Sequence, residues 1–318
     1  PLMDLMADPP PIVPPIPGPG HAPPPPGHDG PPGPPRDAPA PYPTLETERM
    51  QPRVGVETYL RRACTIDSAG QASCWGEPTP DLNARGARIV EAAAGREHVC
   101  ALRTDGRVFC IGDEVNGKTQ VPDVHFKHIA AGNENTCGIT DAGQIQCWGD
   151  TDGSTDGLKS HRITEVSVGA THGCALDTQG HAHCFGCGPD STACDVPEDV
   201  YKAISAGHQH SCALRVDGTP VCWGNDEAGQ ASPPTDLQLT QIAAGWTQTC
   251  GLDASGQIQC WGCGGRLQSM LVTSKDHCQP PSGTFAALSS TDIWGACAVT
   301  AQGQPTCWGG LARQGGPR

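Results

Sequence analysis

Pairs of cysteines ten residues apart recur along the chain and constrain its fold more than any other feature. The first members of successive pairs are 36 to 38 residues apart, except for a last step of 47. The pairs are Cys64 with Cys74, Cys100 with Cys110, Cys137 with Cys147, Cys174 with Cys184, Cys212 with Cys222, Cys250 with Cys260 and Cys297 with Cys307. Seven copies of one unit of about 37 residues indicate a repeat architecture in which each unit packs against its neighbours.

Each cysteine pair encloses a sequence that predicts a β-hairpin. Between Cys137 and Cys147, apolar residues alternate with polar ones around an Asp-Ala-Gly turn centred on Ala142, which is the pattern of two half-buried strands. The two cysteines of such a hairpin face each other at a distance that a disulfide can span. We therefore expect seven cross-strand disulfides that fix the register of the hairpins. The alternative is fourteen free thiols in a reducing compartment.

The four cysteines outside these pairs are Cys187, Cys194, Cys263 and Cys278. Cys187 and Cys263 each complete a Cys-x-x-Cys sequence, a spacing that also occurs in zinc sites and in redox pairs. The other cysteine of each sequence already has a hairpin partner. We therefore expect the bridges Cys187–Cys194 and Cys263–Cys278, which bring the total to nine disulfides.

The repeated unit predicts an all-β fold. A further short apolar strand precedes each cysteine pair, as in residues 128–132 and 241–245. Strands at intervals of about 8–12 residues, with Gly turns and no helical periodicity, are typical of a radial array of sheets. We predict a seven-bladed β-propeller over residues 54–318. A linear β-solenoid is the second choice.

One unit carries, in order, Ala206-Gly-His-Gln-His-Ser-Cys-Ala-Leu214, Asp217-Gly218, Trp223-Gly-Asn225 and Gly229-Gln230. This order of motifs resembles the repeat of the regulator-of-chromosome-condensation family, and the likeness covers residues 54–309. The resemblance implies a seven-bladed propeller and extends to cysteine-rich, exported bacterial members that include propeller-type β-lactamase inhibitors. Paired cysteines are not part of the nuclear members' pattern, and a net charge of −14 does not suit chromatin. Nucleotide exchange on a small GTPase is therefore not expected.

Residues 1–53 differ in composition from the rest of the chain, with 19 of the 32 prolines lying within Pro1–Pro43. Proline has a fixed φ and no N–H, so this segment should form neither a helix nor a central strand. We predict an extended polyproline stalk of at most roughly 130 Å that spaces the propeller from a surface. A docking strip for a proline-recognising module and a disordered tail are the alternatives.

The cysteine content and the charge also restrict where the protein works. Eighteen cysteines suit an oxidising compartment, and an acidic chain is repelled by nucleic acid and by anionic lipid. No apolar run reaches the 18 or so residues of a membrane span. The chain starts at Pro1 without a charged and apolar leader. We therefore expect a processed or truncated chain that is extracellular, at the cell surface or periplasmic, with a membrane tether through its N-terminus left open.

Asp150, Asp152 and Asp156 lie in one Gly-containing loop and form the one candidate calcium site. The other ligands of an EF-hand loop, including the Glu at its twelfth position, are missing. Asp150 stands where other units have an Asn or Asp, so side-chain bonds to the turn backbone explain it as well. We expect no cofactor, with calcium as the alternative.

Histidines occupy one equivalent position in three units, at His98, His172 and His210. Equivalent positions in a propeller are spread around its axis, so hydrogen bonding between blades explains them better than a ring of metal ligands. His181 and His183 alternate along one strand, which suits metal ligation on one strand face. Exposed polar strand residues are the commoner explanation of that pattern.

The units differ most in the residues that follow the repeated Gly of the Gly-x-x-His turn, which predicts a variable recognition surface on a constant scaffold. The candidate binding residues are Arg96, Glu97, Asn133, Glu134, His208, Gln209, Trp246, Thr247 and Trp294. Trp246 is either a binding anchor or a filler of the central channel. No catalytic set is evident, so we predict a non-enzymatic module that binds an exported or envelope protein or has a structural role. An inhibitor of an exported enzyme and a glycan-binding module are the alternatives.

Overall fold

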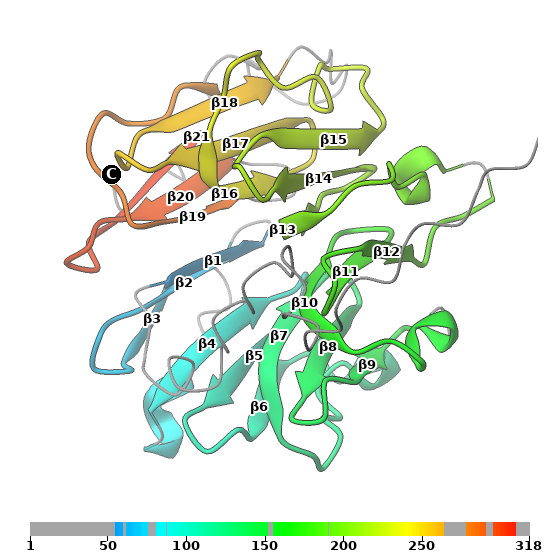
Figure 1. Cartoon of the computed structure of the whole chain (residues 1–318). Coiled ribbons are helices and arrows are strands. Elements are labelled where there is room, and N and C mark those ends of the chain that lie inside the picture. Colours follow the sequence, from blue (N-terminus) through cyan, green and yellow to red (C-terminus); the bar gives the residue numbers. More distant parts are fainter. Residues whose placement is uncertain are drawn as a thin grey trace, which may run out of the picture. The chain divides into compact units, whose positions relative to one another are not determined.

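The computed structural model describes residues 55–59, 62–75, 81–86, 88–151, 155–189, 191–263, 278–290 and 295–309. These residues form seven antiparallel sheets of three consecutive strands each (Figure 1). In the described ranges, no helix has the length and hydropathy needed to cross a membrane. The predicted stalk over residues 1–53 lies outside the described residues and stays a prediction.

Each sheet, or blade, has an inner, a middle and an outer strand in chain order. The inner strands are β1 (Gly55–Tyr59), β4 (Ile89–Ala94), β7 (Phe126–Ala131), β10 (Ile163–Val168), β13 (Tyr201–Ala206), β16 (Leu239–Ala244) and β19 (Ala287–Ser290). The middle strands are β2 (Arg62–Ile66), β5 (His98–Arg103), β8 (Asn135–Thr140), β11 (Gly173–Asp177), β14 (His210–Arg215), β17 (Gln248–Asp253) and β20 (Gly295–Val299). The outer strands are β3 (Ala72–Trp75), β6 (Val108–Gly112), β9 (Ile145–Gly149), β12 (Ala182–Phe185), β15 (Pro220–Gly224), β18 (Ile258–Gly262) and β21 (Pro305–Gly309). Short 3₁₀ helices follow the first four blades: η1 (Leu82–Arg85), η2 (Val115–Gly117), η3 (Asp156–Leu158) and η4 (Thr192–Cys194).

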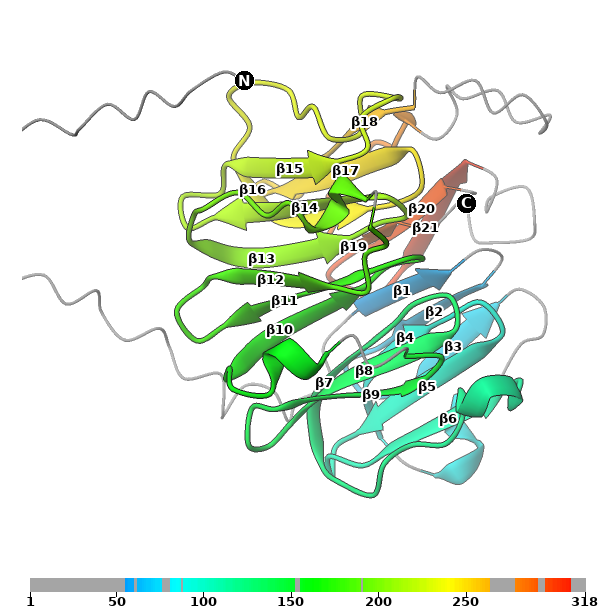
Figure 2. The same cartoon turned by 90° about the vertical axis from the view of Figure 1, so that its right-hand side faces the viewer.

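The inner strands close into a ring. Each inner strand contacts the inner strands of the two neighbouring blades, and β19 of blade 7 contacts β1 of blade 1. Figures 1 and 2 both show the orange-to-red sheet β19–β21 beside the blue sheet β1–β3. A closed radial array of sheets is a β-propeller, so the seven-bladed all-β prediction is confirmed.

The hairpins have the predicted register, with Ile139 lying opposite Ile145 in blade 3. All seven predicted hairpin pairs form disulfides, with Cα–Cα distances of 4.0–4.1 Å. The bonded pairs are Cys64 with Cys74, Cys100 with Cys110, Cys137 with Cys147, Cys174 with Cys184, Cys212 with Cys222, Cys250 with Cys260 and Cys297 with Cys307. The cross-strand pairing predicted from the spacing is therefore confirmed in every blade.

The two additional bridges are also present. Cys187 is bonded to Cys194 and Cys263 to Cys278, with Cα–Cα distances of 6.1 and 6.2 Å. No cysteine is free, so the Cys-x-x-Cys sequences hold neither a zinc-binding set nor a redox pair. So many disulfides indicate an oxidising environment.

The hydrophobic core consists of clusters that each span two neighbouring blades. Ile139 of blade 3 packs with Val166 of blade 4, and Ala63 of blade 1 packs with Val299 of blade 7. Aromatic residues make up only 4% of the chain, so alanine and disulfide-bonded cysteine fill much of the interior. The two faces of a blade are therefore buried mainly by its neighbours.

In blades 5 and 6 the tryptophan after the second cysteine anchors the segment that connects two blades. The indole N–H of Trp223 donates to the carbonyl of Ala193 in η4 at 2.9 Å, and that of Trp261 donates to the carbonyl of Gln230 at 3.0 Å. The Gln230 amide in turn donates to Asn225 Oδ1 at 2.7 Å. The Trp-Gly-x-Asn and Gly-Gln motifs therefore shape the connection between blades.

A β-bulge in β4, β7, β10 and β16 places a polar side chain against the next blade. Each of three such side chains accepts a bond from a backbone N–H group of the next blade. Glu91 accepts from Ile129 at 3.0 Å, Glu165 from Ile204 at 3.1 Å and Gln241 from Leu288 at 3.0 Å. His128 holds the same position in β7, where its ring contacts Glu91 at 2.6 Å and the Val166 carbonyl at 3.0 Å. Burial opposes the charged form of His128, but the Glu91 and Glu165 carboxylates outweigh it and raise the pKa of His128 to about 9.

The cross-strand disulfides should contribute strongly to stability. A chain purified without reductant should be lighter than the reduced chain by the mass of 18 hydrogen atoms. Replacing Cys137 and Cys147 together with Ala should lower the free energy of unfolding by about 3 kcal/mol, because the bridge closes a short loop in the unfolded chain. Mass spectrometry and urea unfolding test both expectations. A double variant as stable as the wild type would contradict the second.

The Glu91–His128 pair predicts a loss of stability in alkali. The folded pKa of His128, about 9, lies above its ordinary value of 6.5. The contribution of the protonated His128 to the free energy of unfolding is therefore complete below pH 6.5 and is lost as the pH rises towards 9. The melting temperature should fall over this interval in the wild type and fall less in His128→Gln. Equal slopes in the two proteins would show that the pair does not titrate as the contacts imply.

Candidate functional site

The candidate binding residues that the structure describes lie in the loops between inner and middle strands, and we call this side of the propeller the loop face. The described candidates are Arg96, Glu97, Asn133, Glu134, His208, Gln209, Trp246 and Thr247. Trp294 lies outside the described residues. Each described loop belongs to a different blade, from blade 2 to blade 6, so the residues gather around the end of the central channel.

Hydrogen bonds link neighbouring loops into a continuous arc. Four bonds of 3.0–3.3 Å run from one loop to the next. They lead from Arg96 N to the Asn133 carbonyl, from Asn133 Nδ2 to the Ala170 carbonyl, from Ala170 N to the Gly207 carbonyl and from His208 N to the Gly245 carbonyl. The second residue of each loop is held by the residue that follows the outer strand of its own blade, whose backbone N–H donates to the loop carbonyl. The donor and acceptor pairs are Asp113 with Glu97, Asp150 with Glu134, Asn225 with Gln209 and Cys263 with Thr247. Backbone bonds, together with one bond from the Asn133 side chain, therefore fix the course of the loops.

The repeated glycine before each loop is required by this arc. A Cβ atom at Gly132, Gly169 or Gly207 would collide with the carbonyl oxygen of the glycine in the next blade. The glycines let the loops of neighbouring blades approach closely enough to bond. The sequence pattern locates these glycines, and the close approach gives the physical reason for them.

His208 and Trp246 stack on each other at the loop face. Their ring centroids are 3.7 Å apart and their planes differ by 18°. Burial lowers the pKa of His208, so the ring is neutral at pH 7 and stacks as an aromatic group. Both side chains are half-buried, and Trp246 is not among the residues that line the channel. Trp246 therefore lies at the loop face and not among the channel-lining residues, and its role as a binding anchor stays a prediction.

A buried lysine organises the charged side of the loop face. Lys118 is 1% exposed, and its amine lies 3.4, 3.2 and 2.6 Å from the carboxylates of Glu97, Asp113 and Glu134. Arg96 also pairs with Glu134, at 3.6 Å. Burial works against the charged amine, but the carboxylates outweigh it and raise the pKa of Lys118. Lys118 was not predictable from the sequence, because a single lysine in a connecting segment carries no repeat signal.

The three equivalent histidines form bonds between blades, as predicted. Nε2 of His98, His172 and His210 lies 2.7, 2.7 and 2.9 Å from the hydroxyls of Thr136, Ser211 and Thr249 in the following blades. Thr249 donates its own proton to the Gln230 carbonyl at 2.9 Å. The Thr249 hydroxyl therefore accepts from His210 Nε2–H.

The histidine and its hydroxyl partner occur together along the repeats. The other four blades have a different residue at the histidine position. These residues, each given with the residue at the facing position of the following blade, are Arg62 with Val99, Asn135 with Gly173, Gln248 with Ala296 and Gly295 with Ala63. None of these facing residues has a hydroxyl. The histidines are thus explained by their partners in the neighbouring blade and need no metal.

Among the described residues of the loop face, two depressions stand out. The end of the central channel has a volume of about 190 Å³ and is lined mainly by small residues, among them Ala170, Gly207 and Gly245. A second depression of about 230 Å³ between blades 3 and 4 includes Glu134, Asp150 and Thr171.

Two of the three candidate calcium ligands are described by the structure. Asp150 lines the depression between blades 3 and 4. Asp156 pairs with Lys159 at 2.7 Å. Asp152 lies outside the described residues, so calcium binding by this loop stays a prediction.

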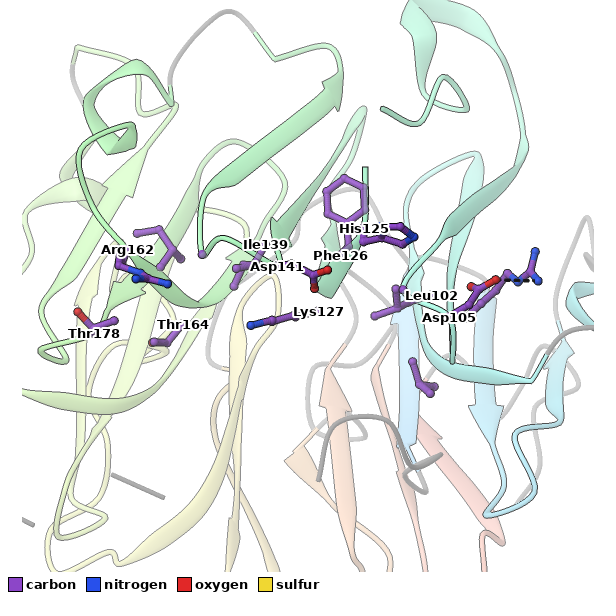
Figure 3. A pocket seen from close by; sticks show the side chains of 15 residues that line it. Leu102, Asp105, His125, Phe126, Lys127, Ile139, Asp141, Arg162, Thr164 and Thr178 are labelled. Carbon is purple, nitrogen blue, oxygen red and sulfur yellow. Dashed lines mark ion pairs between the residues drawn. The ribbon is translucent and has the colours of Figure 1, made fainter. Parts of the chain in front are cut away.

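The opposite face of the propeller holds a larger groove of about 550 Å³ across blades 2, 3 and 4 (Figure 3). Its apolar walls include Leu102, Phe126, Ile139 and Ile163. Its polar and charged residues include His125, Arg103, Asp105, Lys127, Asp141 and Arg162. Arg103 pairs with Asp105 at 3.0 Å. In Figure 3, Arg162 and Asp105 lie at opposite ends of the groove with Lys127 between them. The sequence analysis did not identify this groove, because its residues come from three blades.

Comparison with known proteins agrees with this architecture. A family model for the regulator of chromosome condensation (RCC1) repeat matches residues 89–118, 126–153, 163–190, 201–230 and 239–268. These segments correspond to blades 2 to 6. The chain therefore carries repeats of the RCC1 family on an RCC1-like β-propeller. No curated protein matches the chain in sequence.

Solved structures with the same fold come from different settings. The ectodomain of the Physcomitrella patens receptor kinase CR4 is 22% identical with a TM-score of 0.64, over 81% of this chain and 73% of that one. The CRINKLY ectodomain of the Arabidopsis thaliana receptor kinase ACR4 is 19% identical with a TM-score of 0.64, over 80% and 94%. Prp20p of Saccharomyces cerevisiae, studied for its binding to Gsp1p and histones, is 16% identical with a TM-score of 0.63, over 87% of both chains. At these identities the likeness concerns the fold.

The bonds between blades predict a loss of stability in acid. Burial lowers the pKa of His172 to about 4 and that of His210 to about 3, with neighbouring histidines adding to the effect. Both pKa values in the folded protein lie below the ordinary 6.5. The contribution of the neutral histidines to the free energy of unfolding is therefore complete above pH 6.5 and is lost as the pH falls towards 3. The melting temperature should fall over this interval, and less steeply in His172→Gln/His210→Gln. Glutamine is the residue of blade 6 at this position. An unchanged acid slope in the double variant would contradict the assignment.

Proposed function

We propose that the chain is an exported, non-enzymatic protein-binding module whose contact surface is the loop face. The observation that carries the proposal is the stacked His208–Trp246 pair, which presents a rigid aromatic surface. Tryptophan is enriched among the residues that dominate binding energy. The partner is expected to be an exported or surface-bound protein, because nine disulfides suit a chain that works in an oxidising compartment.

The construction of the loop face supports this role. Hydrogen bonds fix the loop backbones before any partner arrives, so binding orders few groups and loses little conformational entropy. Lys118 holds Glu97 and Glu134 close to Arg96, which sets a charged region on blades 2 and 3 of the face that carries the aromatic pair on blades 5 and 6. Charged groups of this kind contribute to orientation and partner choice more than to affinity.

The fold is compatible with protein binding through a face of the propeller. One solved relative is the yeast RCC1 protein Prp20 in complex with Kap60, at 17% identity and a TM-score of 0.60. This relative supports the idea that a protein with such a propeller binds protein, and it indicates neither the surface that makes the contact nor the partner of this chain. The partner of this chain follows from its own loop residues, which differ from blade to blade.

Site-specific photocrosslinking tests the proposal. A photoreactive residue at Gln209, exposed on the loop face, should capture a protein from the extracellular or surface fraction of the source organism. The same residue at Asp105, in the groove on the opposite face, should capture none. His208→Ala/Trp246→Ala should weaken binding of the captured protein about 30-fold, the equivalent of about 2 kcal/mol. Arg162→Ala, an exposed change in the groove, is the matched control and should bind normally.

The outcomes separate the candidate functions. Capture from Asp105, with binding lost in Arg162→Ala, would place the site in the groove and overturn the loop-face proposal. Binding to a glycan array in the absence of any protein adduct would replace the protein partner with a carbohydrate. An adduct with an enzyme whose activity falls on titration would identify the module as an inhibitor.

A further inference from the structure

Two histidines and one aspartate from three separate segments converge at the outer part of blade 4. His161 follows η3, Asp177 ends β11 and His183 lies in β12. One ligand atom from each lies within 4.8 Å of the other two. The rings of His161 and His183 are in contact, with centroids 4.3 Å apart. Sequence reasoning singles out His181 and His183, but it does not bring His161 and Asp177 to them.

The Asp177 carboxylate is fixed in position by the hairpin. Its Oδ1 atom accepts from the backbone N–H groups of Gln179 and His181 at 2.8 and 3.0 Å. Its Oδ2 atom is thereby turned towards His183 Nε2, at 3.0 Å. The side chain is 6% exposed. Within the described part of the chain, no lysine or arginine pairs with it. These backbone bonds belong to the turn itself, and they leave Oδ2 as the carboxylate oxygen that faces the histidines.

The repeats provide an internal comparison for this hairpin. Asp67 in blade 1 and Asp253 in blade 6 hold the same position as Asp177, and each accepts two backbone N–H groups on Oδ1 in the same way. The residues corresponding to His181 and His183 are Gln71 and Ser73 in blade 1, and Gln257 and Gln259 in blade 6. The aspartate therefore closes the turn without any histidine nearby. The fold does not explain why blade 4 has histidines there.

We propose that His161, Asp177 and His183 bind a divalent transition metal, with Zn²⁺ as the ion that best suits the site. Two imidazole nitrogens and one carboxylate oxygen form a common zinc donor set, whereas calcium and magnesium prefer oxygen ligands alone. Tetrahedral ligands around zinc lie about 3.3 Å apart, so the ligand atoms, which lie within 4.8 Å of one another, would close by up to about 1.5 Å on binding the ion. His181 contacts Asp177 Oδ2 at 3.7 Å but does not belong to the cluster, so a water molecule takes the fourth position.

The bound ion would join segments that no disulfide connects directly. His161 belongs to the connection between blades 3 and 4, while Asp177 and His183 belong to the β11–β12 hairpin. The ion would hold the connection against the hairpin and neutralise the buried carboxylate. All 18 cysteines are in disulfides, so thiolates do not compete for the metal in the oxidised protein.

Calorimetric titration of the oxidised, chelator-treated full chain with Zn²⁺ tests the site. The wild type should bind one equivalent of zinc and should melt at a higher temperature when loaded. His161→Asn/His183→Gln should bind zinc about 100-fold or more weakly. It should keep the metal-free melting temperature, because glutamine stands at the His183 position in blade 6. Tetrahedral absorption of a Co²⁺ complex in the wild type, absent from the variant, gives a readout that is independent of stability.

His125→Gln is the matched control, since His125 is an exposed histidine on the same side of the propeller, and it should bind zinc as the wild type does. No zinc binding in the wild type below millimolar concentration, or equal binding in the double variant, would overturn the proposal. Loss of binding in the control would assign the ion to surface histidines. Tight binding of Ca²⁺ with no response to Zn²⁺ would replace the proposed site by an oxygen-ligand site.

Discussion

Burial between neighbouring blades is the interaction on which the rest of the molecule depends. Each hydrophobic cluster in the described ranges takes residues from two blades, so a three-stranded blade has little core of its own. A blade is stable only when its neighbours are in place, and the last contact, between Val299 of blade 7 and Ala63 of blade 1, completes the ring. The cross-strand disulfides act within a blade, where they fix the register that presents the correct face to the neighbour.

Closure of the ring also determines the character of the loop face. The inner strands end close to the axis, where glycines such as Gly169 allow the loops of adjacent blades to bond. Because backbone groups donate all but one of these bonds, the Asn133 amide being the exception, most loop side chains vary without loss of the scaffold. The scaffold thus depends mainly on the backbone of the loops, and the proposed recognition on their side chains. This division explains how similar blades carry such different residues as Arg96, His208 and Trp246 at one repeat position.

The repeat made most of the fold and the position of the loop face predictable from the sequence. A fixed spacing of cysteines and glycines specifies the hairpin, its turn and its disulfide, because these contacts lie within about ten residues. Contacts between unrelated repeat positions were not predictable, as with Lys118, which reaches Glu134 from a connecting segment, and His161, which meets His183 from another. The path of such segments differs between blades, so repeat spacing does not indicate where they pack. The groove on the opposite face spans three blades and was missed for the same reason.

A repeat protein offers internal controls for deciding which departures from the pattern concern function. His210 departs from Gln248 of the next blade, but its partner Thr249 accounts for the change in structural terms. His183 departs from the glutamine found in blade 6, and the turn it flanks is the same in both blades. The groups that meet His183 are the His161 ring and the Asp177 carboxylate, which both offer ligand atoms for a metal. A departure whose neighbours complete a set of ligand atoms is the kind that selection for a ligand produces, and this separates the blade 4 histidines from those that join the blades.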